Sequence, residues 1–112
     1  MIDHVLQAMA EPHRRDILVL VQHTELSASE IAAHFTDISR QAVSQHLALL
    51  IEAGLLTMHR RGTQRLYRAR PEGLEELRRF LDGFWDEQLH LLKQAAETLE
   101  GRSDPDGVPP TQ

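Results

Sequence analysis

The segment SRQAVSQHLALL, residues 39–50, combines apolar residues at helical spacing with a cluster of hydrogen-bonding side chains. Arginine can bind guanine through two hydrogen bonds, and glutamine can bind adenine in the same way. A helix that carries such groups in its first turns is a candidate for reading bases in the DNA major groove. The candidate contacts are Ser39, Arg40, Gln41, Ser44, Gln45 and His46. For His46 two interpretations stay open, a phosphate contact and a half-buried position.

The charge of the chain is distributed unevenly. The 112 residues carry a net charge of −5, which alone would argue against a polyanionic partner. Residues 36–70, however, hold six arginines and two acidic residues, whereas the segments before and after them are net acidic. A basic segment between acidic ends is typical of a protein that turns one face toward a polyanion.

Two helices are expected at the start of the chain. Apolar residues at helical spacing predict the first over Ile2–Met9. Pro12 begins the second, which runs to about His23, because the missing proline N–H is not needed at the first helical position.

Two further helices follow, separated by a tight turn. Ser27 or Ser29 caps the third helix, and the spacing from Ser27 to Glu30 fits a capping box. Ser39 caps the fourth helix, and Gly54 ends it. The buried stripe of the fourth helix is expected to be Val43, Leu47, Leu50 and Ile51.

The remaining pattern predicts a β-hairpin and one long helix. Strands over Leu55–Arg60 and Gln64–Arg70 flank a glycine-containing turn, and the basic residues near its tip suit phosphate: Arg60, Arg61 and Arg65. The last helix starts at Pro71 and runs to about Glu100. The fold class is therefore mainly α with a small hairpin wing, a winged helix-turn-helix with four helices, two strands and a fifth helix. Residues 1–100 form the DNA-binding and dimerisation domain, and residues 101–112 are expected to be disordered.

Four segments together resemble an ArsR-type (arsenical-repressor-like) transcriptional regulator over about residues 4–100. They are MAEPHRRDIL (9–18), SASEIAAHF (27–35), ISRQAVSQHLALLIEAGLL (38–56) and RRGTQRLYRA (60–69). The resemblance implies a homodimer, joined through its first and last helices, that binds a near-palindromic operator in double-stranded DNA and usually represses. It also implies a basic pair at Arg14 and Arg15, for which phosphate contact and an internal salt bridge are equally open.

The last helix has more apolar surface than a chain of this size can cover by itself. A dimer interface would bury it. The residues expected there are Val5, Leu6, Met9, Leu77, Leu81, Phe84, Trp85 and Leu92. A pocket for a small apolar ligand between the helices is the alternative, and a small-molecule effector would be unidentified.

The sequence departs from the metal-sensing members of that family. The best-known of these sense through cysteines on the third helix, and this chain has no cysteine. Other members use paired Asp/His and His/Glu ligands on the last helix, where His90 has only Asp86 and Glu87 nearby and no second histidine. Its seven histidines are scattered in sequence, so we expect neither a metal site nor a cofactor: they stand at positions 4, 13, 23, 34, 46, 59 and 90. The alternative is a metal-responsive repressor in which His4 and His90 meet across the dimer interface.

Other classes of function fit less well. No nucleophile–base pair, phosphate loop or catalytic carboxylate pair is evident, so an enzyme is not expected. A winged-helix module for protein interaction would need acidic or apolar residues on the fourth helix, where this chain has Arg40 and Gln41. The chain has no long apolar run and no secretion signal, which predicts a cytoplasmic protein without membrane contact.

Overall fold

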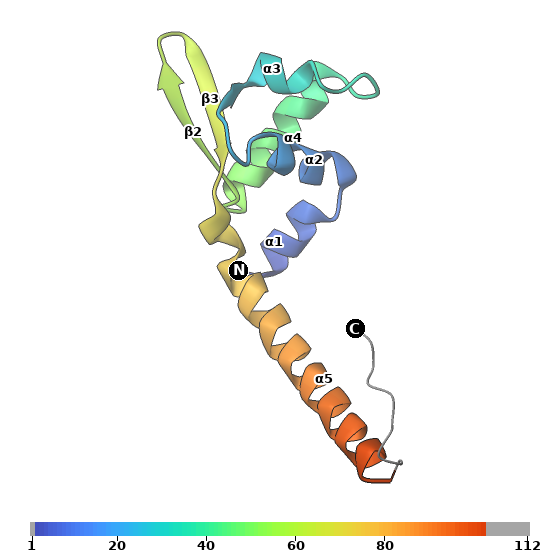
Figure 1. Cartoon of the computed structure of the whole chain (residues 1–112). Coiled ribbons are helices and arrows are strands. Elements are labelled where there is room, and N and C mark those ends of the chain that lie inside the picture. The colour runs from blue at the N-terminus through green and yellow to red at the C-terminus, as the bar shows by residue number, and fades with distance from the viewer. Residues whose placement is uncertain (1, 103–112) are drawn as a thin grey trace. The chain divides into compact units, whose positions relative to one another are not determined.

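The computed structural model describes residues 2–102, with side chains for residues 2–99. The chain divides into two units, residues 1–78 and residues 79–112, which are described separately. In chain order the elements are α1 (Ile2–Met9), α2 (Pro12–Leu20), β1 (Leu26–Ser27), α3 (Ala28–Ala32), α4 (Arg40–Glu52), β2 (Leu56–Arg61), β3 (Gln64–Ala69), the 3-10 helix η1 (Pro71–Leu74) and α5 (Glu75–Arg102) (Figure 1). Of the tail predicted to be disordered, residues 101 and 102 belong to α5, and residues 103–112 lie outside the described residues.

The junction of α1 and α2 is built by the sequence Glu-Pro. Glu11 is the N-cap of α2, and its Oε1 accepts hydrogen bonds from the backbone N–H groups of His13 at 2.6 Å and Arg14 at 3.2 Å. Pro12 is the first helical residue, as predicted. The helix ends at Leu20 and not near residue 23, because the chain turns toward a short strand, β1.

The helix-turn-helix is formed by α3 and α4, and both of its predicted caps are confirmed. Ser27 and Glu30 form the capping box, with the Ser27 N–H donating to Glu30 Oε1 at 2.8 Å and the Glu30 N–H to Ser27 Oγ at 3.1 Å. Ser39 Oγ accepts a hydrogen bond from the Ala42 N–H at 3.0 Å at the start of α4.

The stripe predicted on α4 is buried except at one position. Val43, Leu47 and Leu50 are buried in the core. Ile51 is 38% exposed, so its predicted burial is wrong. It lies about 80° around the helix from Val43, at the edge of the stripe.

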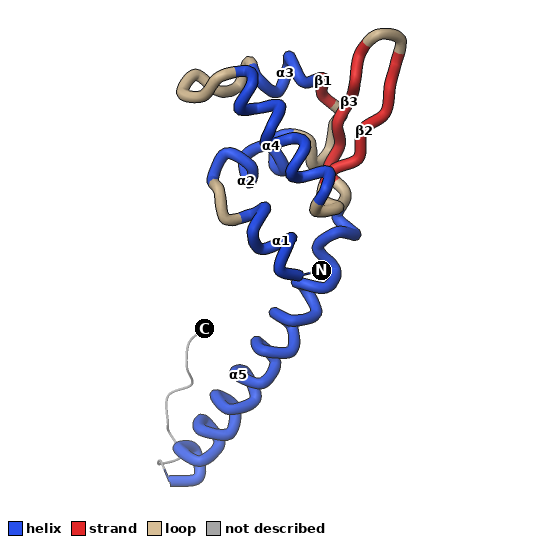
Figure 2. Tube along the Cα trace, turned by 180° about the vertical axis from the view of Figure 1, so that it is seen from behind, coloured by secondary structure: helices blue, strands red, loops and turns tan. Residues whose placement is uncertain are grey.

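The wing is part of a three-stranded antiparallel sheet in the order β1-β3-β2 (Figure 2). Leu26 pairs with Tyr67, and Ser27 pairs with Leu66. The hairpin turns through two residues, 62 and 63, so Arg61 lies in strand β2 opposite Gln64. Strand β1 was not predicted, because two residues are too few to show a period-2 pattern.

The hairpin continues into η1 through a close backbone contact. Gly54 has a φ of 79°, the left-handed conformation expected after the end of α4. Arg70 Nη1 donates to Gly54 O at 3.1 Å. A Cβ on Gly73 would lie 2.1 Å from the same carbonyl oxygen, so only glycine fits there. Pro71 starts this 3-10 helix and not α5, which begins at Glu75.

The core of the first unit contains buried side chains from α1, α2, α3, α4, β2 and β3. Its most deeply buried side chains are Ile17, Val21, Ile31, Val43, Leu47, Leu50 and Leu55. Between residues 2 and 102, no helix is long and apolar enough to cross a membrane.

Candidate DNA-binding surface

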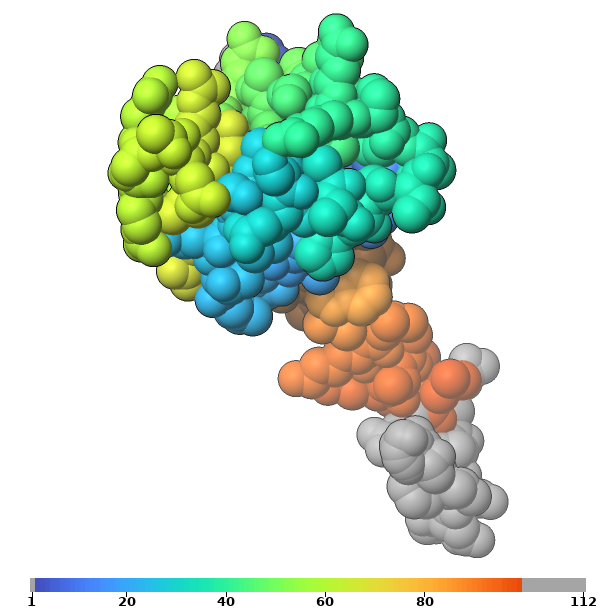
Figure 3. All heavy atoms as spheres, turned by 90° about the horizontal axis from the view of Figure 1, so that it is seen from above, coloured from blue at the N-terminus to red at the C-terminus, as the bar shows by residue number. Residues whose placement is uncertain are grey.

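The outer face of α4 presents polar side chains over its first two turns. Gln41, Ser44 and Gln45 are exposed and form no side-chain hydrogen bond with the described residues. Arg40 is also exposed, and its Nη2 donates to Ser29 Oγ on α3. Figure 3 shows the α3–α4 segment and the hairpin on one face of the first unit, as a winged helix-turn-helix needs for two adjacent contacts with a duplex.

Two arginines of the wing face each other across the hairpin. Arg60 and Arg65 are directly paired between β2 and β3, and both are exposed. Neither is paired with an acidic residue in the part of the chain that the structure describes. Like charges directly opposite in a sheet destabilise it. Such a pair is therefore better explained by a polyanionic ligand than by folding.

Arg61 differs from Arg60 and Arg65, although all three were predicted from the sequence to contact phosphate. Its Nη2 lies 3.4 Å from Glu25 Oε1, and His59 Nδ1 lies 3.0 Å from the other oxygen of the same carboxylate. Glu25 thus partly neutralises Arg61, which is therefore a weaker candidate for phosphate than Arg60 or Arg65.

The basic pair on α2 is used inside the protein. Arg14 Nε donates to Ala8 O at 2.6 Å and its Nη2 to Gln7 O at 3.2 Å, while Arg15 Nη1 donates to Met9 O at 2.6 Å. These carbonyls are at the C-terminal end of α1, where they have no partner within the helix. The two arginines cap α1 and form no ion pair with the described residues, so the internal salt bridge is not formed, and the phosphate contact stays a prediction.

His46 is half-buried, which is one of the two positions that the sequence analysis left open for it. Arg14 Nη1 donates to His46 Nδ1 at 3.1 Å, and the ring stacks on that of His13 with centroids 5.9 Å apart. Burial lowers the pKa of His46. The Glu11 carboxylate opposes this shift, whereas the nearby charges of Arg14 and His13 act in the same direction as burial. The ring is therefore a packing residue that couples α4 to α2.

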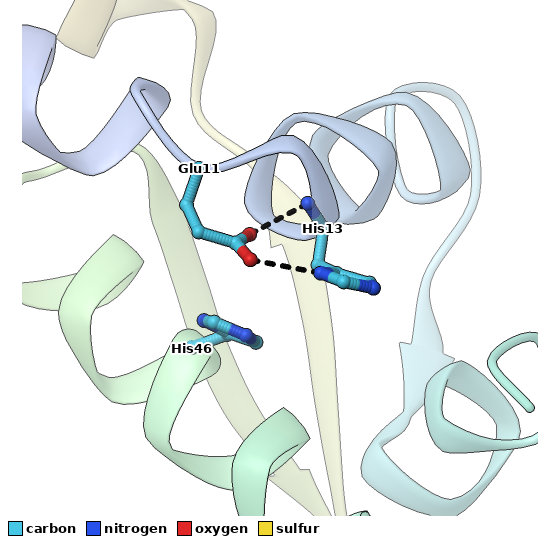
Figure 4. A group of neighbouring side chains, drawn as sticks. All are labelled: Glu11, His13 and His46. Carbon is cyan, nitrogen blue, oxygen red and sulfur yellow. Dashed lines mark hydrogen bonds and ion pairs between the residues drawn. The ribbon is translucent and has the colours of Figure 1, made fainter. Parts of the chain in front are cut away.

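His13 joins the start of α2 to the turn before α4. Its Nδ1 lies 2.8 Å from Glu11 Oε2, and its Nε2 lies 2.7 Å from Asp37 Oδ2. The hydrogen bonds to Glu11 and then to Asp37 raise the pKa of His13. The hydrogen bond to His13 in turn lowers the pKa of Glu11 to about 2. Figure 4 shows Glu11, His13 and His46 gathered at one point, a convergence that the sequence analysis missed because it considered the histidines scattered.

The residues predicted for the dimer interface differ in exposure. Leu81, Phe84, Trp85 and Leu92 on α5 are each at least half exposed, and Leu6 on α1 is 48% exposed. Met9 and Leu77 are half-buried against the core. Val5 is only 4% exposed and packs in the core of its own chain. It has almost no surface to offer a second copy in this conformation, so it is the weakest of the predicted interface residues.

Comparison with known proteins identifies the family. The profile of a helix-turn-helix domain family matches residues 9–59. The HTH-type transcriptional regulator Rv2034 of Mycobacterium tuberculosis is 41% identical over 87 residues, covering 78% of this chain and 80% of the relative. The transcriptional repressor SdpR of Bacillus subtilis is 38% identical over 61 residues, covering 54% of this chain and 67% of the relative.

A solved structure extends the likeness to the fold. It is described as the homodimeric winged helix-turn-helix DNA-binding domain of a possible ArsR-family transcriptional regulator from Mycobacterium bovis. Its TM-score is 0.60 at 30% identity, covering 79% of this chain and 81% of that one. The expected fold class is confirmed, and the chain belongs to the ArsR family of winged helix-turn-helix transcriptional regulators.

Proposed function

We propose that this chain is a sequence-specific repressor that binds a near-palindromic operator as a homodimer. The observation that carries the proposal is the exposed polar start of α4 beside an arginine pair, Arg60 and Arg65, that no described acid neutralises. In this arrangement α4 enters the major groove and the wing contacts the backbone. The printed name of the Bacillus subtilis relative, a transcriptional repressor, supports repression as the output.

The α4 side chains divide by their availability. Gln41 and Gln45 are free to bind adenine through their amide groups, and Ser44 is free to bind a base or a phosphate. Arg40 can contact guanine only by leaving Ser29 or by sharing its guanidinium between the two. Gln41 is therefore the cleanest position at which to test base recognition.

The homodimer is proposed from the apolar face of α5. Leu81, Phe84, Trp85 and Leu92 recur at helical spacing and are at least half exposed. A continuous apolar stripe of this size marks a protein–protein contact. The homodimer described for the Mycobacterium bovis domain supports the same assembly here. A two-fold dimer matches an operator whose half-sites are related by two-fold symmetry.

The test begins with selection of bound fragments from random or genomic DNA. Fluorescence anisotropy then compares the selected operator with a scrambled duplex. A good base contact is worth about 1–3 kcal/mol and a dimer has two copies of Gln41, so Gln41→Ala should lower specific affinity about 30-fold or more, with much less effect on the scrambled duplex. Gln22→Ala removes the same side chain from an exposed position after α2 and should change neither. A Gln41→Ala protein that keeps the wild-type specificity ratio would contradict base recognition by this residue.

A module for protein interaction remains the second candidate. Its exposed apolar α5 face would then serve a different protein, and selection would enrich no DNA sequence. Because operator DNA is the proposed ligand, the proposal implies a cytoplasmic protein that regulates transcription and does not catalyse a reaction.

A further inference from the structure

Three side chains from two helices bring metal-binding atoms together. Glu11 caps α2, His13 lies in its first turn, and His46 lies in the middle of α4. One ligand atom from each lies within 4.8 Å of the other two, and all three residues are half-buried. Figure 4 shows the Glu11 carboxylate above the two imidazole rings. Only small side-chain movements would be needed to place the three atoms around one ion.

The donor set identifies the class of metal. Two imidazoles and one carboxylate are the protein ligands of several zinc sites that keep a fourth position for water. Imidazole also suits copper and nickel, whereas magnesium and calcium prefer oxygen ligands alone. Trivalent arsenic needs thiolates, and the 112 residues contain no cysteine. The cluster therefore fits a borderline divalent transition metal.

The surroundings of His13 match those of a metal-binding histidine. Its Nδ1 faces the cluster, and its Nε2 lies 2.7 Å from Asp37 Oδ2. Metal-binding histidines usually donate their other N–H to a carboxylate, which fixes the ring and its tautomer. A metal at Nδ1 would replace one proton and leave the Nε2–H bond to Asp37 in place. The edge of Phe35, with ring centroids 5.5 Å apart, also holds this ring.

The Glu11 carboxylate is likewise held in a position suited to metal binding. Its Oε1 accepts the two backbone hydrogen bonds that cap α2, which fixes the carboxylate and leaves Oε2 toward the cluster. At His46 the metal would compete with the bond that Arg14 Nη1 donates at 3.1 Å. Arg14 would keep its bonds to Ala8 and Gln7 at the end of α1. The position of the Arg14 guanidinium therefore does not depend on its hydrogen bond to His46.

We propose that Glu11, His13 and His46 form a binding site for a zinc-like divalent transition metal, with Asp37 as the carboxylate that orients His13. The site would connect α2 to α4 by coordination bonds in addition to the existing hydrogen bonds. Metal binding to the free protein does not require DNA, so the inference stands or fails independently of the proposed function.

The experiment uses untagged, metal-stripped protein in a buffer without phosphate or chelator. Zinc chloride is titrated by calorimetry, and the expected result is one zinc ion per chain. Glu11→Gln keeps an N-cap group while removing the carboxylate, and it should weaken zinc binding at least about tenfold, as should His46→Ala. Asp37→Asn should weaken it about 10- to 100-fold.

The control is His23→Ala, which removes an exposed histidine outside the cluster and should bind zinc like the wild type. Magnesium chloride should show no binding at the same concentrations. Circular dichroism confirms folding of every variant, and Glu11→Gln carries the test if His46→Ala does not fold. Wild-type protein without zinc binding, or Glu11→Gln with wild-type affinity, would overturn the proposal and leave the cluster as a hydrogen-bond network that serves folding alone.

Discussion

Replacing Arg60 by glutamine should weaken DNA binding without destabilising the protein. Arg60 lies directly opposite Arg65 in the hairpin, and no described acid pairs with either. The substitution removes a like-charge contact, so it should leave the protein as stable as before or stabilise it by at most about 0.5 kcal/mol, because both groups are exposed and screened by solvent. If the wing holds phosphate, the same substitution should weaken DNA binding.

The size of the loss can be derived from the number of phosphate contacts. A dimer has two wings, so Arg60→Gln removes two contacts, and each contributes about 0.9 to the slope of log affinity against log salt. The slope should therefore become shallower by about 1.8. Between 50 and 200 mM salt the wild type should lose about 12-fold more affinity than the variant.

The assay is anisotropy on operator and scrambled duplexes across that salt range, with urea unfolding in parallel. Both duplexes should be affected alike, because phosphate contacts carry no sequence information. Arg68→Gln is the control for stability, since Arg68 lies in β3, the strand that pairs with the strand of Arg60, but is opposite the uncharged Thr57. An unchanged salt slope for Arg60→Gln would refute the phosphate role of the wing, whatever its effect on stability.

Three further predictions concern backbone packing, assembly and protonation. Gly73→Ala should lower the free energy of unfolding by about 1–3 kcal/mol, because its Cβ would lie 2.1 Å from the Gly54 carbonyl oxygen. Gly83→Ala should raise it by about 0.5–1 kcal/mol, because a Cβ at this position of α5 meets no atom within 4 Å. Equal urea midpoints for the two variants would contradict this prediction. Leu81→Glu should convert a dimer of 12.8 kDa chains into a folded monomer, measured by light scattering, and a stable dimer would exclude α5 from the interface. In metal-free protein with chelator, the raised pKa of His13 means that its ion pairs stabilise the fold fully below its unfolded pKa of about 6.5. Urea titrations should show that stabilisation disappearing as pH rises through the folded pKa, with His13→Gln lacking this loss.

Local signals made the helices and their caps predictable. A capping box needs only Ser27, Glu30 and the backbone between them, so spacing in the sequence suffices. The strand β1 depends on backbone pairing with β3, about 40 residues later, and two residues carry no pattern of their own. The contact between His13 and His46 likewise joins residues 33 positions apart. Pro12 did predict the start of α2, but nothing local indicated that Glu11 caps it or that His13 has a partner on α4.

Tertiary contacts decide which polar residues of α4 remain available to DNA. Ser39 bonds to the α4 backbone, Arg40 to α3, and His46 to α2. The first bond caps the helix, and the other two hold it against its neighbouring helices. Gln41 and Gln45 bond to no described side chain and face solvent. A binding group discriminates best when its support is rigid, because a loosely held donor can turn to satisfy the wrong base. The residues of this segment that are bonded to the rest of the fold would therefore contribute to specificity by restricting the positions of Gln41 and Gln45.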